Sequence, residues 1–186
     1  MDALELLHNR VSCPLLLEPA PTPDQMDNMF KAAMRAPDHA ALRPWRFMVV
    51  EGDQREALGD IYLKASLQDD AELSEAKQKK LRNAPLRAPV VVVVVAHKTD
   101  HPKVPVSEQL ITVGCATHAM LYAAHAQGVG AMWRTGPMAY HPTVMAELGL
   151  ADNEEIVGFL YLGTPKVVRQ APEVDMEPYV TRWEAS

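Results

Sequence analysis

Three short segments of this sequence bring a cation together with a hydroxyl, an imidazole or an indole. They are Arg10-Val11-Ser12, Arg35-Ala36-Pro37-Asp38-His39 and Trp133-Arg134-Thr135. A guanidinium makes paired, charge-assisted hydrogen bonds to phosphate oxygens, and aromatic rings stack on flat molecules. Three such segments in one short chain indicate a flat, charged ligand, but they do not name it.

Each segment also has a simpler interpretation. Arg10 beside Ser12 is what many protein surfaces show. Arg35 could meet the negative end of a helix dipole, with His39 merely exposed to solvent. Trp133 could be a core indole at the end of a strand. Loops on a rigid scaffold are where binding residues concentrate, so composition alone leaves the two interpretations of Arg35–His39 evenly balanced.

Other catalytic chemistries find less support. His97 and His101, and His118 and His125, have no further ligand at useful spacing, and the sequence contains neither HExxH nor CxxC, so we expect no metal site. Cys115 precedes His118 by one helical turn, but packing is the better explanation of a thiol in an Ala-rich helix. GxSxG, GxGxxG and P-loop motifs are absent from the sequence, and we expect no catalytic side chain.

Composition narrows the class of protein. The chain has 186 residues, a net charge of −6 and a pI near 5.6, which argues against a nucleic-acid partner. Cys13 and Cys115 lie far apart and favour reduced thiols, hence a cytoplasmic protein. The first residues are acidic where a signal peptide is basic. The longest apolar run, 88–96, is half the length needed to span a bilayer, so we expect no membrane association.

The periodicity predicts helices and strands in irregular order. Leu4 and Leu7 are expected to face inward from an opening helix, and Thr22 with Gln25 forms the pattern of a capping box. The uniform Val90–Val95 run is typical of a central strand covered on both faces. The expected helices are 2–8, 22–35, 53–67, 72–82, 107–127 and a short one from 141, and the expected strands are 45–51, 89–96, 129–134 and 156–162.

The helix over 107–127 is the most informative element. It is rich in Gly, Ala, Met and Thr and carries little charge after Glu108, so it lies either deep in the domain or in a subunit interface. The order of elements favours one α+β domain over 1–186. The tail over 166–186 lacks periodicity, and a partner subunit is one candidate for the surface that it covers.

Taken together, the motifs resemble those of the nitroreductase family, and in particular its smallest bacterial members. The similarity runs from Met1 to about Pro165. The segments that carry it are Met1–Leu7, Asn9-Arg10-x-Ser12, Arg35–His39 with Pro44-Trp45, Gln127-Gly128-x-Gly130 with Trp133-Arg134, and Ile156–Pro165.

This resemblance implies a nitroreductase-like fold, with a central mixed sheet flanked by helices and an intertwined homodimer that holds two FMN molecules at its interface. Arg10, Val11 and Ser12 would come from one subunit and approach a flavin bound mainly by the other. Arg35 and His39 would contact the ribityl and phosphate region. The isoalloxazine ring would lie along Trp133, Arg134 and Thr135. The resemblance assigns the nicotinamide donor to one further stretch, Ala123, Ala124, His125, Ala126, Gln127 and Gly128.

Two departures from the family's pattern concern positive charge. Val11 stands where a second Arg is usual, and no basic residue occurs between Cys13 and Leu15. Arg43 stands where the family usually has Gln. Lost cations should weaken phosphate binding unless Lys166, Arg43 or Arg46 takes their place.

The implied activity is a ping-pong transfer of electrons from NAD(P)H through FMN to a small acceptor such as a nitroaromatic or a quinone. The flavin carries the hard chemistry, and protons come from solvent or His39. Two alternatives stay open. One is a flavin-binding sensor or store without turnover, and the other is a cofactor-free interaction protein that uses the small-residue helix as its interface.

Overall fold

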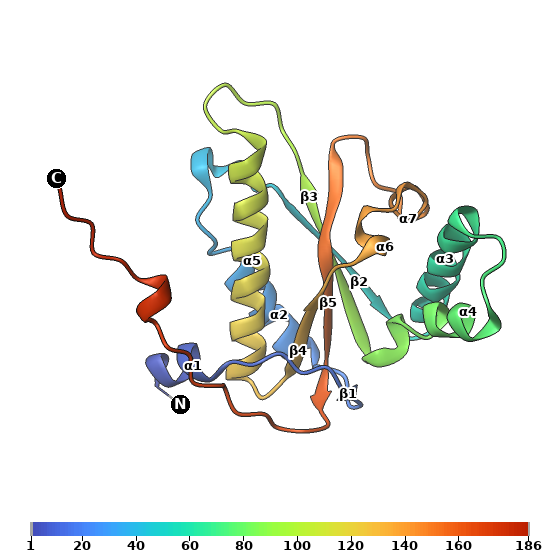
Figure 1. Ribbon diagram of the computed structural model, residues 1–186, viewed down its shortest axis with the longest axis horizontal. Coiled ribbons are helices and arrows are strands. Elements are labelled where there is room, and N and C mark those ends of the chain that lie inside the picture. Colours follow the sequence, from blue (N-terminus) through green and yellow to red (C-terminus); the bar gives the residue numbers. More distant parts are fainter. Residues whose placement is uncertain (1, 186) are drawn as a thin grey trace.

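The computed structural model describes residues 2–185, in which a five-stranded sheet lies between helices in an α+β arrangement (Figure 1). No helix in this range is long and apolar enough to cross a membrane. The helices and strands, in chain order, are α1 (Ala3–Asn9), β1 (Leu16–Leu17), α2 (Pro23–Ala33), η1 (His39–Ala41), β2 (Trp45–Glu51), α3 (Gln54–Asp69), α4 (Glu75–Arg82), η2 (Pro85–Arg87), β3 (Val90–His97), α5 (Val106–Ala126), β4 (Gly130–Arg134), α6 (Pro137–Tyr140), α7 (Pro142–Glu147), β5 (Glu154–Pro165) and η3 (Glu177–Tyr179).

The strand order is β1-β5-β3-β2, with β4 also paired to β5, and every pairing is antiparallel. The expected mixed sheet is therefore wrong in this detail. The helices α3 and α4 pack against each other and return the chain to the end where β2 stops, so β3 runs back along β2. A single-helix crossover through α5 makes β3 and β4 parallel in direction, but β5 lies between them and pairs with both.

Strand β3 is the centre of the fold. Val90, Val92 and Val94 face the layer of α2 and α5. The alternate residues Val91 and Val93 face the layer of α3, α6 and α7. Side chains alternate across a strand, and all six valines of this run are buried. The prediction of a strand covered on both faces is confirmed.

Helix α1 differs from its prediction. Its Asp2–Glu5 capping box is formed, but Leu4 and Leu7 are 63% and 49% exposed rather than turned inward. The helix lies against the C-terminal end of α5, where the Tyr122 hydroxyl donates to the Leu7 carbonyl at 3.1 Å. No core layer of the described chain lies beneath it, so its apolar side chains stay at the surface.

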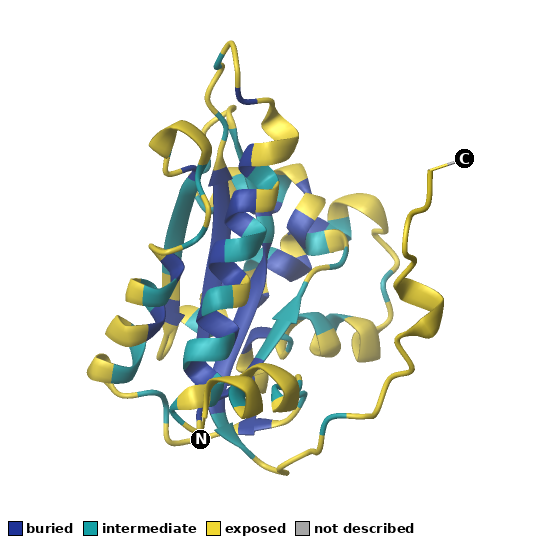
Figure 2. Ribbon diagram, turned by 90° about the vertical axis from the view of Figure 1, so that its left-hand side faces the viewer, coloured by how far each residue is buried: buried dark blue, intermediate teal, exposed yellow. Residues whose placement is uncertain are grey.

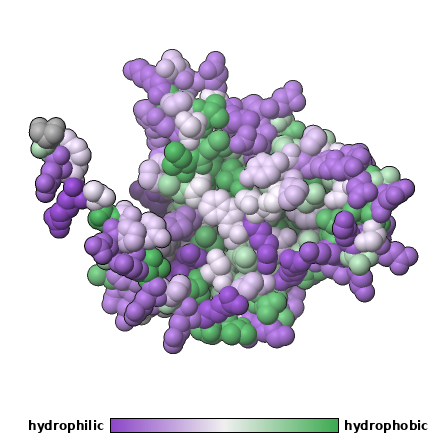
Figure 3. Space-filling model, viewed as in Figure 1, coloured by the Kyte–Doolittle hydropathy of each residue, from purple (hydrophilic) through white to green (hydrophobic). Residues whose placement is uncertain are grey.

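Helix α5 is buried along one side only. Val113, Ala116 and Met120 are fully buried against the sheet, whereas Ile111 is 66% exposed and His118 is also exposed. Figure 2 shows this alternation along the helix, and Figure 3 shows apolar surface where α5 runs. The sequence allowed two placements, and the structure shows a helix that is buried on one face and exposed on the other within the described chain.

After β5 the C-terminal tail first passes the N-terminal segment, where Val168 and Arg169 line a cavity together with Arg10, and its last part then leaves the body (Figure 1). It carries large exposed apolar side chains, among them Val168, Tyr179 and Trp183. An extended segment with such side chains buries too little apolar area to order itself alone. Its composition therefore favours contact with another surface.

One ion pair at the edge of the sheet leads to a pH-dependent prediction. Arg46 donates to both carboxylate oxygens of Glu154, at 2.8 and 2.6 Å, and this holds the pKa of Glu154 at about 2 against the opposing effect of burial. A carboxyl group with a lowered pKa stabilises the fold at pH values above its ordinary pKa of 4.5. This stabilisation is lost as the pH falls from 4.5 toward 2.

We expect the wild type to lose ~2 kcal/mol relative to Glu154→Gln over that interval, less than full linkage because Arg46 is partly exposed. Urea unfolding of both proteins at pH 5.5 and pH 3 measures the difference. Unfolding free energies that change in parallel with pH would contradict this assignment.

Candidate functional site

Arg10 follows α1 and lies at the C-terminal end of α5. Its guanidinium carbon is 5.7 Å from the centroid of the Tyr122 ring, a cation–π distance. Its Nε is buried and has no hydrogen-bond partner within the described residues. The chain then runs extended past the exposed Ser12 to Cys13, whose N–H donates to the Ala131 carbonyl at 2.9 Å. This bond holds the segment against β4.

A small cavity of about 210 Å³ opens beside Arg10. His125 and Arg169 also line it, together with backbone of Gly128–Ala131, and no acidic side chain is among its lining residues in the part of the chain described. The Nε2 atom of His125 is buried without a partner there too. Basic groups without a carboxylate to pair with are the chemistry of an anion site.

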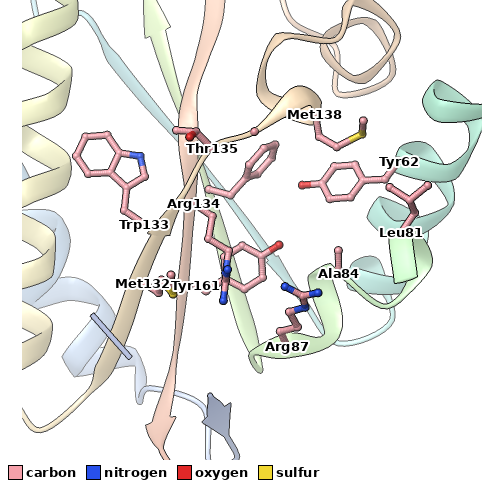
Figure 4. A pocket seen from close by; sticks show the side chains of 12 residues that line it. Tyr62, Leu81, Ala84, Arg87, Met132, Trp133, Arg134, Thr135, Met138 and Tyr161 are labelled. Carbon is pink, nitrogen blue, oxygen red and sulfur yellow. The ribbon is translucent and has the colours of Figure 1, made fainter. Parts of the chain in front are cut away.

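Strand β4 sends its two long side chains to opposite faces of the sheet. The Trp133 indole lies toward α5, with Nε1 at 3.4 Å from the Val157 carbonyl. Arg134 lies on the other face, 5.4 Å from the centroid of the Tyr161 ring, and donates to the Pro14 carbonyl at 3.4 Å. Figure 4 shows the two side chains diverging from the strand. On the face that carries the Arg134 side chain, Trp133 therefore contributes only its backbone.

Two larger cavities, about 450 and 440 Å³, meet at Arg134 and Arg87. The first is walled by Tyr62, Met132, Met138, Phe159 and Tyr161, and Thr135 and Gly136 close one end (Figure 4). The second lies along Pro14–Leu17 and includes Lys166. We call these two cavities together the β4 trough.

The tyrosine hydroxyls of the β4 trough are protonated at neutral pH. Burial raises the pKa of Tyr161, while the positive charges of Arg134 and Arg87 lower it by a smaller amount. Burial also raises the pKa of Tyr62, whose hydroxyl is buried and has no partner within residues 2–185. Both hydroxyls can therefore donate hydrogen bonds to a ligand in the trough.

Arg35 and His39 lie elsewhere. Arg35 is exposed after α2, and the Pro37 carbonyl accepts from the Thr112 hydroxyl at 3.0 Å. His39 Nδ1 is 2.9 Å from a carboxylate oxygen of Glu108, at the N-terminal end of α5 (Figure 1).

The axial separation follows from α5 itself. Tyr122, next to Arg10, comes 14 residues after Glu108, so helical rise separates the two ends by ~21 Å. One copy of the chain thus brings Arg10–Ser12 and Trp133–Thr135 together along β4 and leaves Arg35–His39 apart.

The stretch assigned to NAD(P)H has mixed exposure. Ala124 is fully buried, and Ala123 and His125 are half-buried. Gln127 ties α5 to α2: its Nε2 donates to the Ala123 and Gln25 carbonyls, and its Oε1 accepts from Asn28. Ala126 and Gly128 are the exposed residues of this stretch.

The structure sorts the cations that could replace the missing ones. Lys166 lines the β4 trough, whereas Arg46 is held by Glu154 and Arg43 is exposed next to η1. Arg87 and Arg169 also line the cavities, and both lie outside the segments that the motifs predicted. The one available signal for Arg87 was a basic residue shortly before a buried strand. Arg169 lies in a tail that lacks periodicity.

Gly158 allows the Trp133 indole to lie flat against the sheet. A Cβ at this position would meet Nε1 of Trp133 at 2.1 Å and the Arg134 carbonyl at 2.9 Å.

We expect Gly158→Ala to destabilise the fold by about 2 kcal/mol, as overpacking of a core does. Gly52→Ala is the control for loss of a glycine, because no atom lies within 4 Å of its Cβ position, although its positive φ adds strain of its own. Thermal unfolding with tryptophan fluorescence measures both, and a Gly158→Ala variant with unchanged fluorescence and stability would contradict the packing described.

Comparison with known proteins decides the family. The model of the nitroreductase family matches residues 8–164. The chain belongs to the nitroreductase family. It is 45% identical over 186 residues to the Escherichia coli (strain K12) protein named "Putative NAD(P)H nitroreductase YdjA", covering 97% of this chain and 99% of the relative.

Solved nitroreductase structures have the same fold. A nitroreductase-like family protein from Bacillus cereus superposes with a TM-score of 0.85 at 20% identity, covering 100% of this chain and 97% of the other. The FMN-dependent nitroreductase NfnB of Mycobacterium smegmatis, solved in complex with NADPH, gives 0.75 at 18% identity, covering 98% of each chain. The family and the nitroreductase-like fold predicted from the motifs are confirmed, and the roles of individual residues stay predictions.

Proposed function

We propose that this nitroreductase-family chain is an FMN-dependent oxidoreductase that passes electrons from NAD(P)H to a small acceptor, of the nitroaromatic or quinone class, by a ping-pong mechanism. One observation carries the proposal. The buried Nε atoms of Arg10 and Arg134 have no partner among residues 2–185, and these two residues line two cavities that the Arg10–Pro14 segment also lines. Buried guanidinium groups are almost always paired, so these fit a ligand with an anionic end and a polar ring edge.

The residues fit FMN in two parts. The cavity of Arg10, His125 and Arg169 has the size and charge for a phosphate, with Ser12 beside it as a hydroxyl donor. The β4 trough offers aromatic and thioether walls and the backbone of Thr135 and Gly136 for the ring. FMN, when bound, supplies the electron transfer itself, and the side chains bind and orient it.

The site is complete only in a homodimer. Arg35 and His39 are ~21 Å along α5 from Arg10 in one copy, so they serve the same flavin only if they come from a second copy. Antiparallel packing of α5 on its symmetry mate would place the Glu108 end of one helix beside the Tyr122 end of the other. The exposed Ile111 and the exposed Leu4 and Leu7 supply apolar surface for such an interface.

Two further features support a dimer. Partial desolvation and the nearby Arg10 lower the pKa of the exposed His118, so this imidazole is neutral at pH 7 and suits a desolvated interface. The exposed Trp183 and Tyr179 of the tail need a covering surface, and we place it on the second copy.

The remaining roles complete the proposal. His39, whose Nδ1 contacts Glu108, can deliver a proton to the acceptor. NAD(P)H is assigned to 123–128, with Ala126 and Gly128 as the exposed contacts. Both cysteines are free thiols, in keeping with the proposed cytoplasmic location.

The absorption spectrum of the purified protein tests the proposal first. We expect flavin bands, one FMN per chain, and steady-state NADPH oxidation with nitrobenzene or a simple quinone as acceptor. Tightly bound FMN without turnover would favour a flavin sensor or store. Protein that is colourless and stays so after incubation with FMN would favour the cofactor-free interaction protein.

A further inference from the structure

Arg87 is a cation of the β4 trough that belongs to none of the family's motifs named above. It ends the turn η2, shortly before β3 begins, and its neighbour Ala88 is fixed because Arg55 donates to the Ala88 carbonyl at 2.8 Å. Figure 4 shows the guanidinium groups of Arg87 and Arg134 on the same side of the sheet, both beside Tyr161. Neither Arg87 nor Arg134 forms an ion pair within the described chain, and neither cavity of the trough is lined by an acidic residue there.

The trough lies where this chain has lost positive charge. Pro14 and Leu15, from the segment that lacks a basic residue, line the same cavity as Arg87, Arg134 and Lys166. Arg134 even donates to the Pro14 carbonyl. Cations from three distant parts of the sequence therefore surround the segment that carries none.

We propose that Arg87, acting with Arg134, replaces the cation missing between Cys13 and Leu15 and binds the polar N1–C2 carbonyl edge of the flavin ring. The inference rests on the proposed function and extends it to a residue outside the motifs. The side chains that line the trough beside Arg87 and Arg134 favour binding of the flavin ring rather than of the phosphate. Tyr161, Phe159 and Met132 are apolar or aromatic surfaces that suit a flat ring, whereas the phosphate has its own basic cavity at Arg10.

The pair also has an electronic consequence. Two-electron reduction places negative charge on the N1–C2 carbonyl edge, and charges near N1 tune flavin electronics. The guanidinium groups of Arg87 and Arg134 form no ion pair within the described chain, and cations already held beside this edge stabilise the developing negative charge without reorganisation. Arg87 should therefore bind reduced FMN more tightly than oxidised FMN and raise its midpoint potential.

The test compares Arg87→Gln with Arg87→Lys and with Arg82→Gln. Arg82 is an arginine five residues earlier that is already paired with Asp60 outside the trough. Dissociation constants for FMN and for riboflavin are measured on apoprotein by fluorescence quenching, and the midpoint potential is measured on the reconstituted protein. We expect Arg87→Gln to weaken FMN and riboflavin alike by about tenfold. We also expect a further tenfold loss for the reduced form, which lowers the potential by about 30 mV for a two-electron couple.

Arg87→Lys should restore most of the potential, and Arg82→Gln should behave as the wild type. Circular dichroism of each variant checks that it is folded. An Arg87→Gln protein with wild-type affinity and potential would overturn the proposal, and so would one that weakens FMN but leaves riboflavin unchanged, which would place Arg87 at the phosphate. Failure of the wild type to bind either flavin would instead contradict the proposed function.

Discussion

An Ile111→Asp variant is expected to be a monomer in solution and to bind FMN at least about 100-fold more weakly than the wild type. Ile111 is 66% exposed on the free face of α5, and the proposed interface would bury a carboxylate there without a partner. Such burial costs several kcal/mol, and a 100-fold loss of affinity needs only ~2.7 kcal/mol. Loss of the dimer weakens FMN binding, because Arg35 and His39 reach the flavin from the second copy.

Size-exclusion chromatography with light scattering gives the oligomeric state, and flavin fluorescence gives the dissociation constant. Val49→Asp is the matched control, because Val49 is 46% exposed on β2, away from the free face of α5. We expect it to stay dimeric and to bind FMN normally. A monomeric Ile111→Asp protein with wild-type affinity would show that one copy builds the whole site.

An Arg10→Gln variant is expected to bind FMN about 10 to 100-fold more weakly but riboflavin within about threefold of the wild type. A hydrogen bond to a charged group contributes about 1.5–3 kcal/mol, and riboflavin lacks the phosphate that we assign to the cavity of Arg10 and Arg169. Added salt should weaken FMN binding to the wild type more than to the variant.

A comparison of FMN with riboflavin therefore distinguishes the proposed phosphate site at Arg10 from the proposed ring site at Arg87. Arg10→Gln should discriminate between FMN and riboflavin, whereas Arg87→Gln should not. Arg82→Gln serves again as the paired, distant arginine. Equal weakening of both flavins by Arg10→Gln would move Arg10 from the phosphate to the ring.

Local chemistry made several elements predictable from the sequence. Thr22 and Gln25 form the capping box that their spacing predicted, with the Thr22 N–H donating to Gln25 at 2.9 Å and the Gln25 N–H donating to Thr22 at 3.3 Å. The valine run of β3 is buried on both faces. Caps and burial periodicity depend on residues within a few positions of one another, so a single sequence contains them.

The sequence predicted which segments form the site, but not how their side chains are arranged in space. The motifs indicated Arg10–Ser12, Arg35–His39 and Trp133–Thr135, but the alternation of β4 turns the Trp133 indole toward α5 and Arg134 into the trough. The convergence of Arg87 with Arg134 depends on the order of β3, β5 and β4 in the sheet. Strand order is a matter of long-range pairing, which local spacing does not specify.

The sequence by itself determined the family, the α+β fold class and the residue types that suit a flavin phosphate and ring. Only the tertiary structure decided that the sheet is wholly antiparallel, that Leu4 and Leu7 stay exposed, and that His39 and Arg10 lie at opposite ends of α5. The physical reason is that burial depends on what packs over a residue. No part of the described chain packs over Leu4, Ile111 or the end of the tail, whereas the proposed second copy would cover them.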